Sequence, residues 1–132
     1  MGVHQPNVTG TWISEIPGQG LVTRTQLSGS ETYYDVEMNL TQAGDTASGT
    51  IKLTVVRVGH LISKEWIGKT FSSPVTGKVV GDSIELKIGD KMFKGGWTED
   101  YISCTSQWIE QGGPVGGSIP QKGEAVLKVK KV

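Results

Sequence analysis

The chain has 132 residues, and its 13 lysine and arginine residues balance its 13 aspartate and glutamate residues. A chain of this length forms one domain with a sizeable core, and it contains no block of like charge. Nucleic acid and anionic membrane surfaces are therefore poor candidates as partners. We expect a single domain over residues 1–132, with a loose leader at residues 1–7.

The composition indicates short strands joined by tight turns. The chain contains 19 glycines and five prolines, and threonine, serine and valine are prominent. No run of twelve or more residues has convincing helical periodicity. The first strand is expected at about residues 8–16, followed by a turn at residues 17–20 and a second strand at residues 21–27.

The clearest strand is the segment from Thr32 to Thr41, in which apolar and polar residues alternate. One face of this segment carries Tyr34, Val36, Met38 and Leu40, the pattern of a half-buried antiparallel strand. The next strand is expected at residues 46–58, with isoleucine, leucine and valine facing inward at every second position. Continuation of that alternation would turn Arg57 inward near the end of the strand.

Residues 57–72 are the least regular part of the sequence. They form either a long connection at the rim of a barrel or a strand with a bulge at Gly59 or Gly68, and the pattern does not choose between the two.

Hairpins return from Pro74 to the end of the chain. Over residues 92–97 two phases are possible, and the size of Phe93 and Trp97 favours an inward position for both. The segment from Tyr101 to Glu110 carries Cys104 and Trp108 on one face, and a last strand follows a glycine-rich loop. Eight to ten strands in series close most easily into a barrel, with a sandwich as the alternative. The predicted fold is all-β, an antiparallel up-and-down β-barrel of about eight strands.

Near the N-terminus, Gly10 and Trp12 lie two positions apart and so share one face of an extended strand. The tetrapeptide from Thr9 to Trp12 resembles the avidins, and the motif and strand pattern together resemble the calycin-like barrels, which include lipocalins and fatty-acid-binding proteins. This resemblance implies a lipocalin-like or streptavidin-like barrel with Trp12 at one end. In avidins, polar residues after the tryptophan hold biotin, and here only Ser14 is a counterpart. In lipocalins a basic residue near the end of the last strands packs over the tryptophan, and the resemblance implies that Lys128 or Lys130 has this role here.

An eight-stranded barrel has room for side chains or for one small ligand. Large rings beside small inward residues suit a pocket for an apolar or aromatic molecule, with Arg57 placed to hold a carboxylate. We therefore predict a binding protein for such a molecule. The predicted ligand-binding residues are Trp12, Tyr34, Met38, Arg57, Trp66, Trp97, Cys104 and Trp108.

The alternative function is a barrel enzyme, a cyclase or isomerase that shapes an apolar substrate in the same cavity. The acid or base would come from side chains that can move a proton, and the candidates are Tyr34, His60, Glu65 and Tyr101. The sequence contains no metal-binding or nucleotide-binding motif, so no metal and no cofactor are expected.

Cys104 is the one cysteine of the sequence, so no internal disulfide can form. A cytoplasmic location is the simplest interpretation, or a secreted one if a leader has been removed. Ile13, Val56 and Ile109 are expected on the outer face, where they would allow a homodimer.

Overall fold

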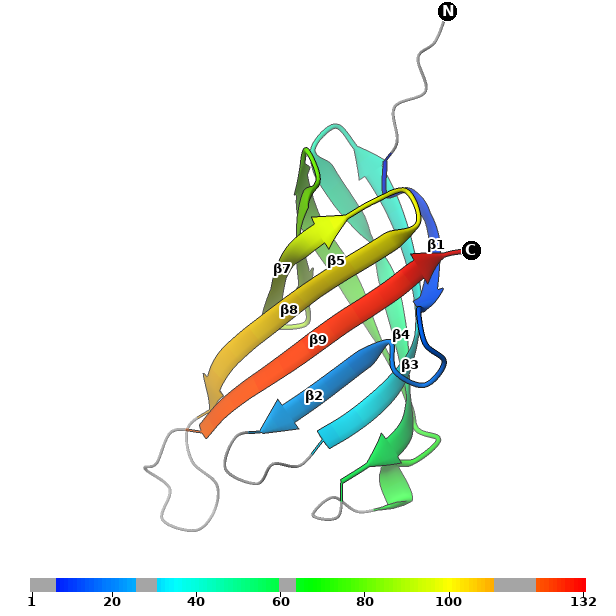
Figure 1. The fold of residues 1–132 in the computed structure, drawn as a ribbon, viewed down its shortest axis with the longest axis vertical. Coiled ribbons are helices and arrows are strands. Elements are labelled where there is room, and N and C mark those ends of the chain that lie inside the picture. The colour runs from blue at the N-terminus through cyan, green and yellow to red at the C-terminus, as the bar shows by residue number, and fades with distance from the viewer. Residues whose placement is uncertain (1–6, 26–30, 60–63, 111–120) are drawn as a thin grey trace, which may run out of the picture.

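The computed structural model describes residues 7–25, 31–59, 64–110 and 121–132, which form nine strands and one short 3₁₀-helix (Figure 1). In chain order the elements are β1 (Gly10–Ser14), β2 (Leu21–Thr25), β3 (Glu31–Ala43), β4 (Thr46–Val58), η1 (Lys64–Trp66), β5 (Thr70–Val80), β6 (Ser83–Ile88), β7 (Lys91–Trp97), β8 (Tyr101–Glu110) and β9 (Gln121–Lys131).

The strands form one closed antiparallel barrel. From β3 to β9 each strand pairs with the next, and β1 and β2 each pair with both β3 and β9. β1 lies opposite residues 37–40 of β3, and β2 lies opposite residues 31–34. The two short strands therefore share one position in the wall. Nine strands fill eight positions, which confirms the predicted up-and-down barrel of about eight strands.

Between β1 and β2 the chain leaves the wall and returns to it. The amide of Gln19 donates to the carbonyl of Ile16 at 2.9 Å, and Gly18 has a φ of 79°, the arrangement of a type II turn after Pro17. On return, the amide of Gly20 donates to the carbonyl of Tyr34 at 3.0 Å. The chain therefore rejoins the sheet just before β2. The turn that the sequence predicts at residues 17–20 is present.

The core lies inside the barrel and is built from alternate residues of every strand. Val36, Met38 and Leu40 of β3 are buried, as predicted, and Phe93 of β7 is buried while Met92 is exposed, which settles the phase of that strand. The largest fully buried side chains are Trp12, Met38, Ile51, Ile84, Leu86, Ile102 and Leu127. Their burial supplies the main favourable term in folding.

The predicted inward position of Arg57 is wrong. The register between β3 and β4 shifts at Tyr33 and Tyr34, so that Tyr33 pairs with Arg57 while Tyr34 pairs with Val55. This bulge leaves Val56 as an extra residue and reverses the alternation beyond it. Arg57 is exposed on the outer face, where its guanidinium carbon lies 5.0 Å from the ring centroid of Tyr33.

The irregular segment at residues 57–72 is a connection rather than a continuous strand. β4 ends at Val58 and β5 begins at Thr70, with η1 between them. Residues 60–63 of this segment lie outside the described part of the chain. The alternative, a strand with a bulge at Gly59 or Gly68, is not what forms, and the bulge in β4 lies earlier, at Val56.

One end of the barrel, here called the Trp12 end, is sealed by the first residues of the described chain. Trp12 and Val8 have no exposed surface, and the indole Nε1 of Trp12 donates to the carbonyl of Val8 at 2.9 Å. The amide of Val8 donates to Oε1 of Gln42 at 3.0 Å, which holds the segment across the end. Trp12 therefore plugs the barrel in the place that its motif predicts.

The opposite end, here called the Trp108 end, carries η1 and the turn between β6 and β7 (Figure 1). β2 and β8 run towards this end, and β3 and β9 start from it. In the described part of the chain, no helix is long and apolar enough to cross a lipid bilayer.

Candidate functional site

At the Trp108 end, β7 and β8 stop pairing with each other. Their register covers Lys94–Trp97 of β7 and residues 102–105 of β8. The first three residues of β7 pair only with β6, and β8 from Ser106 onward pairs only with β9. The two strands therefore lack a shared hydrogen-bond ladder at this end, and the inner faces that they carry there are the candidate site.

Lys91 and Trp108 meet across this unpaired stretch. Lys91 is on the inner face of β7, because it lies two positions before buried Phe93 and four before Gly95. Its Nζ lies 4.6 Å from the ring centroid of Trp108, within the range of a cation–π contact. The same indole lies against Gly123, where an added Cβ would fall 2.7 Å from Cζ2 of the ring and closer still to Nε1. Trp108 is thus positioned by Gly123 and by Lys91.

Trp108 keeps part of its surface exposed although it packs against the core. Ser106, two positions earlier and on the same inner face, is buried, and its hydroxyl has no hydrogen-bond partner among the described residues. A buried hydroxyl without a partner is costly in a native protein unless something else satisfies it. Ser106 and Trp108 together offer a polar group and an aromatic surface at one end of the barrel.

Tyr34 also packs against the core and remains partly exposed. Burial raises the pKa of its phenol above the usual value, and a hydrogen bond with Thr23 opposes part of that rise. The hydroxyl therefore keeps its proton at neutral pH and can act as a neutral hydrogen-bonding group.

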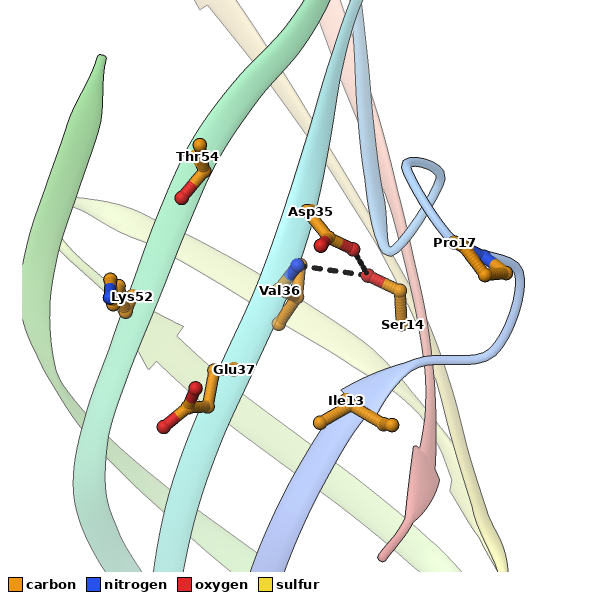
Figure 2. A pocket seen from close by; sticks show the side chains of 8 residues that line it. All are labelled: Ile13, Ser14, Pro17, Asp35, Val36, Glu37, Lys52 and Thr54. Carbon is orange, nitrogen blue, oxygen red and sulfur yellow. Dashed lines mark hydrogen bonds between the residues drawn. The ribbon is translucent and has the colours of Figure 1, made fainter. Parts of the chain in front are cut away.

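A second feature is a hollow of about 330 Å³ on the outer face of the barrel, beneath the excursion between β1 and β2 (Figure 2). Pro17 of the excursion overhangs it. The lining residues are Ile13, Ser14, Pro17, Asp35, Val36, Glu37, Lys52 and Thr54. The hollow is open to solvent and combines apolar side chains with charges of both signs.

The polar groups of this hollow are mostly committed to structure. Ser14 Oγ donates to Asp35 Oδ1 at 2.6 Å and accepts from the amide of Val36 at 2.8 Å (Figure 2). The amide of Gly18 donates to the same carboxylate oxygen at 3.2 Å. These hydrogen bonds, that from Ser14 first, lower the pKa of Asp35. Ser14, the counterpart of a biotin-binding residue, thus has its hydroxyl occupied.

The predicted ligand-binding residues are dispersed. Tyr34 and Trp108 lie on the inner face at the Trp108 end. Trp97 lies at the other end, where its Nε1 donates to the carbonyl of Gly81 at 2.9 Å. Trp66 is 45% exposed in η1 and stacks on Phe71 with 5.9 Å between ring centroids. The three members that are fully buried in the core are Trp12, Met38 and Cys104.

Of the predicted catalytic residues, Tyr34 and Tyr101 are not brought together by the structure. Tyr34 belongs to β3 near the Trp108 end, while Tyr101 is the first residue of β8, at the Trp12 end, and is exposed. Glu65 is exposed in η1. His60 lies outside the described residues.

Sequence reasoning missed two inward residues, Lys91 at one end and Lys131 at the other. Lys91 follows from the alternation of Phe93, Gly95 and Trp97 if that alternation is extended two residues towards the N-terminus. Lys131, rather than Lys128 or Lys130, packs over the first tryptophan, with its Nζ 5.6 Å from the ring centroid of Trp12. Ser106 is on the face that the sequence indicated, but no local pattern reveals that its hydroxyl lacks a partner.

Among the described residues, no three histidine, cysteine, aspartate or glutamate side chains are grouped so that they could hold a metal ion. No protein-family model matches the chain, and comparisons with curated proteins and with solved structures find no match.

Proposed function

We propose that the barrel binds one small apolar or aromatic molecule through the inner face of its Trp108 end. The observation that carries the proposal is the partly exposed ring of Trp108 on the inner face of β8, beside the stretch where β7 and β8 are unpaired. Aromatic rings that stand on a rigid wall and keep accessible surface are common in small-molecule sites.

The difference between the two ends supports this location. At the Trp12 end a lysine and a tryptophan also meet, but there the indole has no exposed surface and its Nε1 is hydrogen-bonded to Val8. At the Trp108 end the corresponding indole is partly exposed. A ligand would therefore enter at the Trp108 end, and Trp12 would serve as structure.

The proposal is tested by titration with N-phenyl-1-naphthylamine, an uncharged aromatic probe whose emission rises in apolar surroundings. We expect saturable binding of one probe per chain, weakened at least roughly tenfold by Trp108→Ala, because a stacked aromatic contact is removed. Trp66→Ala is the matched control, since Trp66 is an exposed tryptophan outside the barrel. Absence of saturable binding, or binding that depends on Trp66 and not on Trp108, would contradict the proposal.

Native mass spectrometry of the purified protein provides a second, independent readout. A ligand retained through purification appears as a constant mass added to the chain, and the Trp108→Ala variant should lose it. The same spectra report the oligomeric state, so they also test the homodimer predicted from Ile13, Val56 and Ile109. Val56 and Ile109 are 39% and 70% exposed, which leaves them available for such a contact.

The cyclase or isomerase alternative stays a prediction. Its candidate residues Tyr34 and Tyr101 lie at opposite ends of the barrel, so they cannot act on one bound substrate together. Tyr34 alone could donate a hydrogen bond or a proton, but its raised pKa makes it a poor base at neutral pH. Binding without turnover is therefore the function that the geometry favours.

A further inference from the structure

The inner face at the Trp108 end carries the positive charge of Lys91 and the hydroxyl of Ser106, which has no hydrogen-bond partner among the described residues. We infer that the ligand of this barrel is an amphipathic anion, whose apolar or aromatic body lies against Trp108 and whose acidic group is held by Lys91 and Ser106. The inference rests on the proposed function, because it names the chemical class of the molecule bound at the same end.

Lys91 is oriented for this role by its place in the wall. Its neighbours on β7 alternate, with Met92 and Lys94 exposed on the outer face and Phe93 buried on the inner face. The side chain of Lys91 is 30% exposed, whereas that of Lys94 is 71% exposed. The ammonium group of Lys91 is thus held over the Trp108 ring at 4.6 Å, while that of Lys94 lies on the outer face, 3.9 Å from the carboxylate of Glu85.

Among the described residues, the carboxylate of Asp90 pairs with this ammonium group, but it competes only weakly for it. Asp90 Oδ2 lies 3.6 Å from Lys91 Nζ, but its side chain is 87% exposed in the turn between β6 and β7. An ion pair in that setting is worth little, because water screens both charges. An ammonium group has three N–H donors, so a bound anion can be accepted alongside the contacts with Asp90 and Trp108.

The carboxylates of β3 and β9 do not compete with a ligand on the inner face. Alternation places the carboxylates of β3 and β9 on the outer face, where Glu31 and Glu124 pair with Arg24 at 3.1 Å and 4.0 Å. Asp35 and Glu37 likewise line the outer hollow. These four carboxylates therefore do not repel an anion bound on the inner face.

Ser106 provides the second, independent observation. Its hydroxyl is 4% exposed and has no hydrogen-bond partner among the described residues, although it lies on the same face as Trp108. A carboxylate or sulfonate oxygen would accept the hydrogen of this hydroxyl and remove the cost of burying it unpaired. A purely apolar ligand would leave the hydroxyl unsatisfied.

The test compares two probes with the same aromatic body. 8-Anilino-1-naphthalenesulfonate carries an anion, and N-phenyl-1-naphthylamine lacks it. Lys91→Met keeps an apolar side chain over Trp108 but removes the charge. We expect it to lower the affinity for the sulfonate probe roughly tenfold and the affinity for the uncharged probe less than about twofold. Ser106→Ala should lower the affinity for the sulfonate probe by a smaller factor. High salt should lower the affinity for the sulfonate probe only.

Lys94→Met is the matched control, since it removes a lysine from the outer face of the same strand. If Lys91→Met and Lys94→Met affect the sulfonate probe equally, the inference is overturned. If both probes bind and Lys91→Met weakens them by the same factor, the inference fails while the proposed function stands. If neither probe binds the wild-type protein, the proposed function itself fails. Urea midpoints of both variants establish that they are folded.

Discussion

Ser14 donates its hydroxyl hydrogen to Oδ1 of Asp35 across 2.6 Å and so ties the end of β1 to the middle of β3. The same hydroxyl accepts from the buried amide of Val36. Residues 15–20 leave the barrel wall at this point, so no neighbouring strand residue accepts a hydrogen bond from the amide of Val36. The hydroxyl of Ser14 accepts it instead. The strand position shared by β1 and β2 therefore depends on one small polar side chain.

Replacement of Ser14 by alanine should lower the free energy of unfolding by about 1–3 kcal/mol, because the amide of Val36 is left buried without an acceptor. Urea denaturation followed by tryptophan fluorescence measures the change. Ser103→Ala, on the exposed face of β8, is the control and should change the free energy by less than about 0.5 kcal/mol. Equal effects of the two substitutions would show that Ser14 has no special part in the wall.

The stability contributed by Asp35 should depend on pH. Its folded pKa lies below the ordinary value of 3.8, mainly because Ser14, and also Gly18, donate hydrogen bonds to the carboxylate. The contribution is therefore complete above about pH 5 and is lost as the pH falls through the folded pKa, below 3.8. We expect the stability difference between wild type and Asp35→Asn to shrink between pH 6 and pH 3 in urea titrations. A difference that stays constant over this range would rule out the linkage.

Two adjacent glycines of β7 should respond in opposite ways to substitution. A Cβ on Gly95 would collide with the backbone carbonyl oxygen of Ser103 on β8, whereas a Cβ on Gly96 would lie 3.3 Å from the carbonyl oxygen of Asp82. Gly95→Ala should therefore cost at least about 2 kcal/mol of stability, and Gly96→Ala less than about 1 kcal/mol. Thermal unfolding of the two variants side by side measures the contrast. Equal stabilities of the two variants would mean that β7 and β8 can move apart at Gly95 without a loss of stability.

Cys104 should be unreactive in the folded protein. Burial raises the pKa of its thiol to about 12, and the side chain has almost no exposed surface. The thiolate that attacks disulfide reagents is therefore scarce and inaccessible at pH 8. With 5,5′-dithiobis(2-nitrobenzoate) we expect one thiol per chain to react rapidly in concentrated urea and only slowly, at the rate of opening, in buffer. Rapid reaction in buffer would contradict the buried position.

Trp12→Phe should destabilise the barrel by about 2–4 kcal/mol, because a fully buried ring becomes smaller and the hydrogen bond to Val8 is lost. Trp66→Phe changes an exposed ring and should have an effect below about 0.5 kcal/mol. The urea midpoints of the two variants measure the difference. Probe binding at the Trp108 end should persist in Trp12→Phe, which separates a structural role from a binding role.

Much of the fold follows from local patterns. Alternation over β3 predicts its length and its buried face, and the same rule at β7 and β9 identifies Phe93 and Val129 as inward residues. Part of the candidate site could also be predicted, since alternation alone places Tyr34 and Trp108 on the inner face. The outward position of Arg57 could not be predicted in this way, because a bulge in β4 shifts the alternation by one residue. The bulge arises from the pairing of β4 with β3 and leaves no local pattern.

The amino-acid sequence by itself indicated which segments form strands and which face of most strands is apolar, and it favoured a barrel of about eight strands over a sandwich. These properties depend on side-chain periodicity, which is local. The tertiary structure alone decided that the chain closes on itself, that β1 and β2 share one position, that Val8 and Trp12 seal one end, and that Lys91 meets Trp108 at the other. Those relationships depend on the register between distant strands, where a shift of one residue exchanges the inner and outer faces.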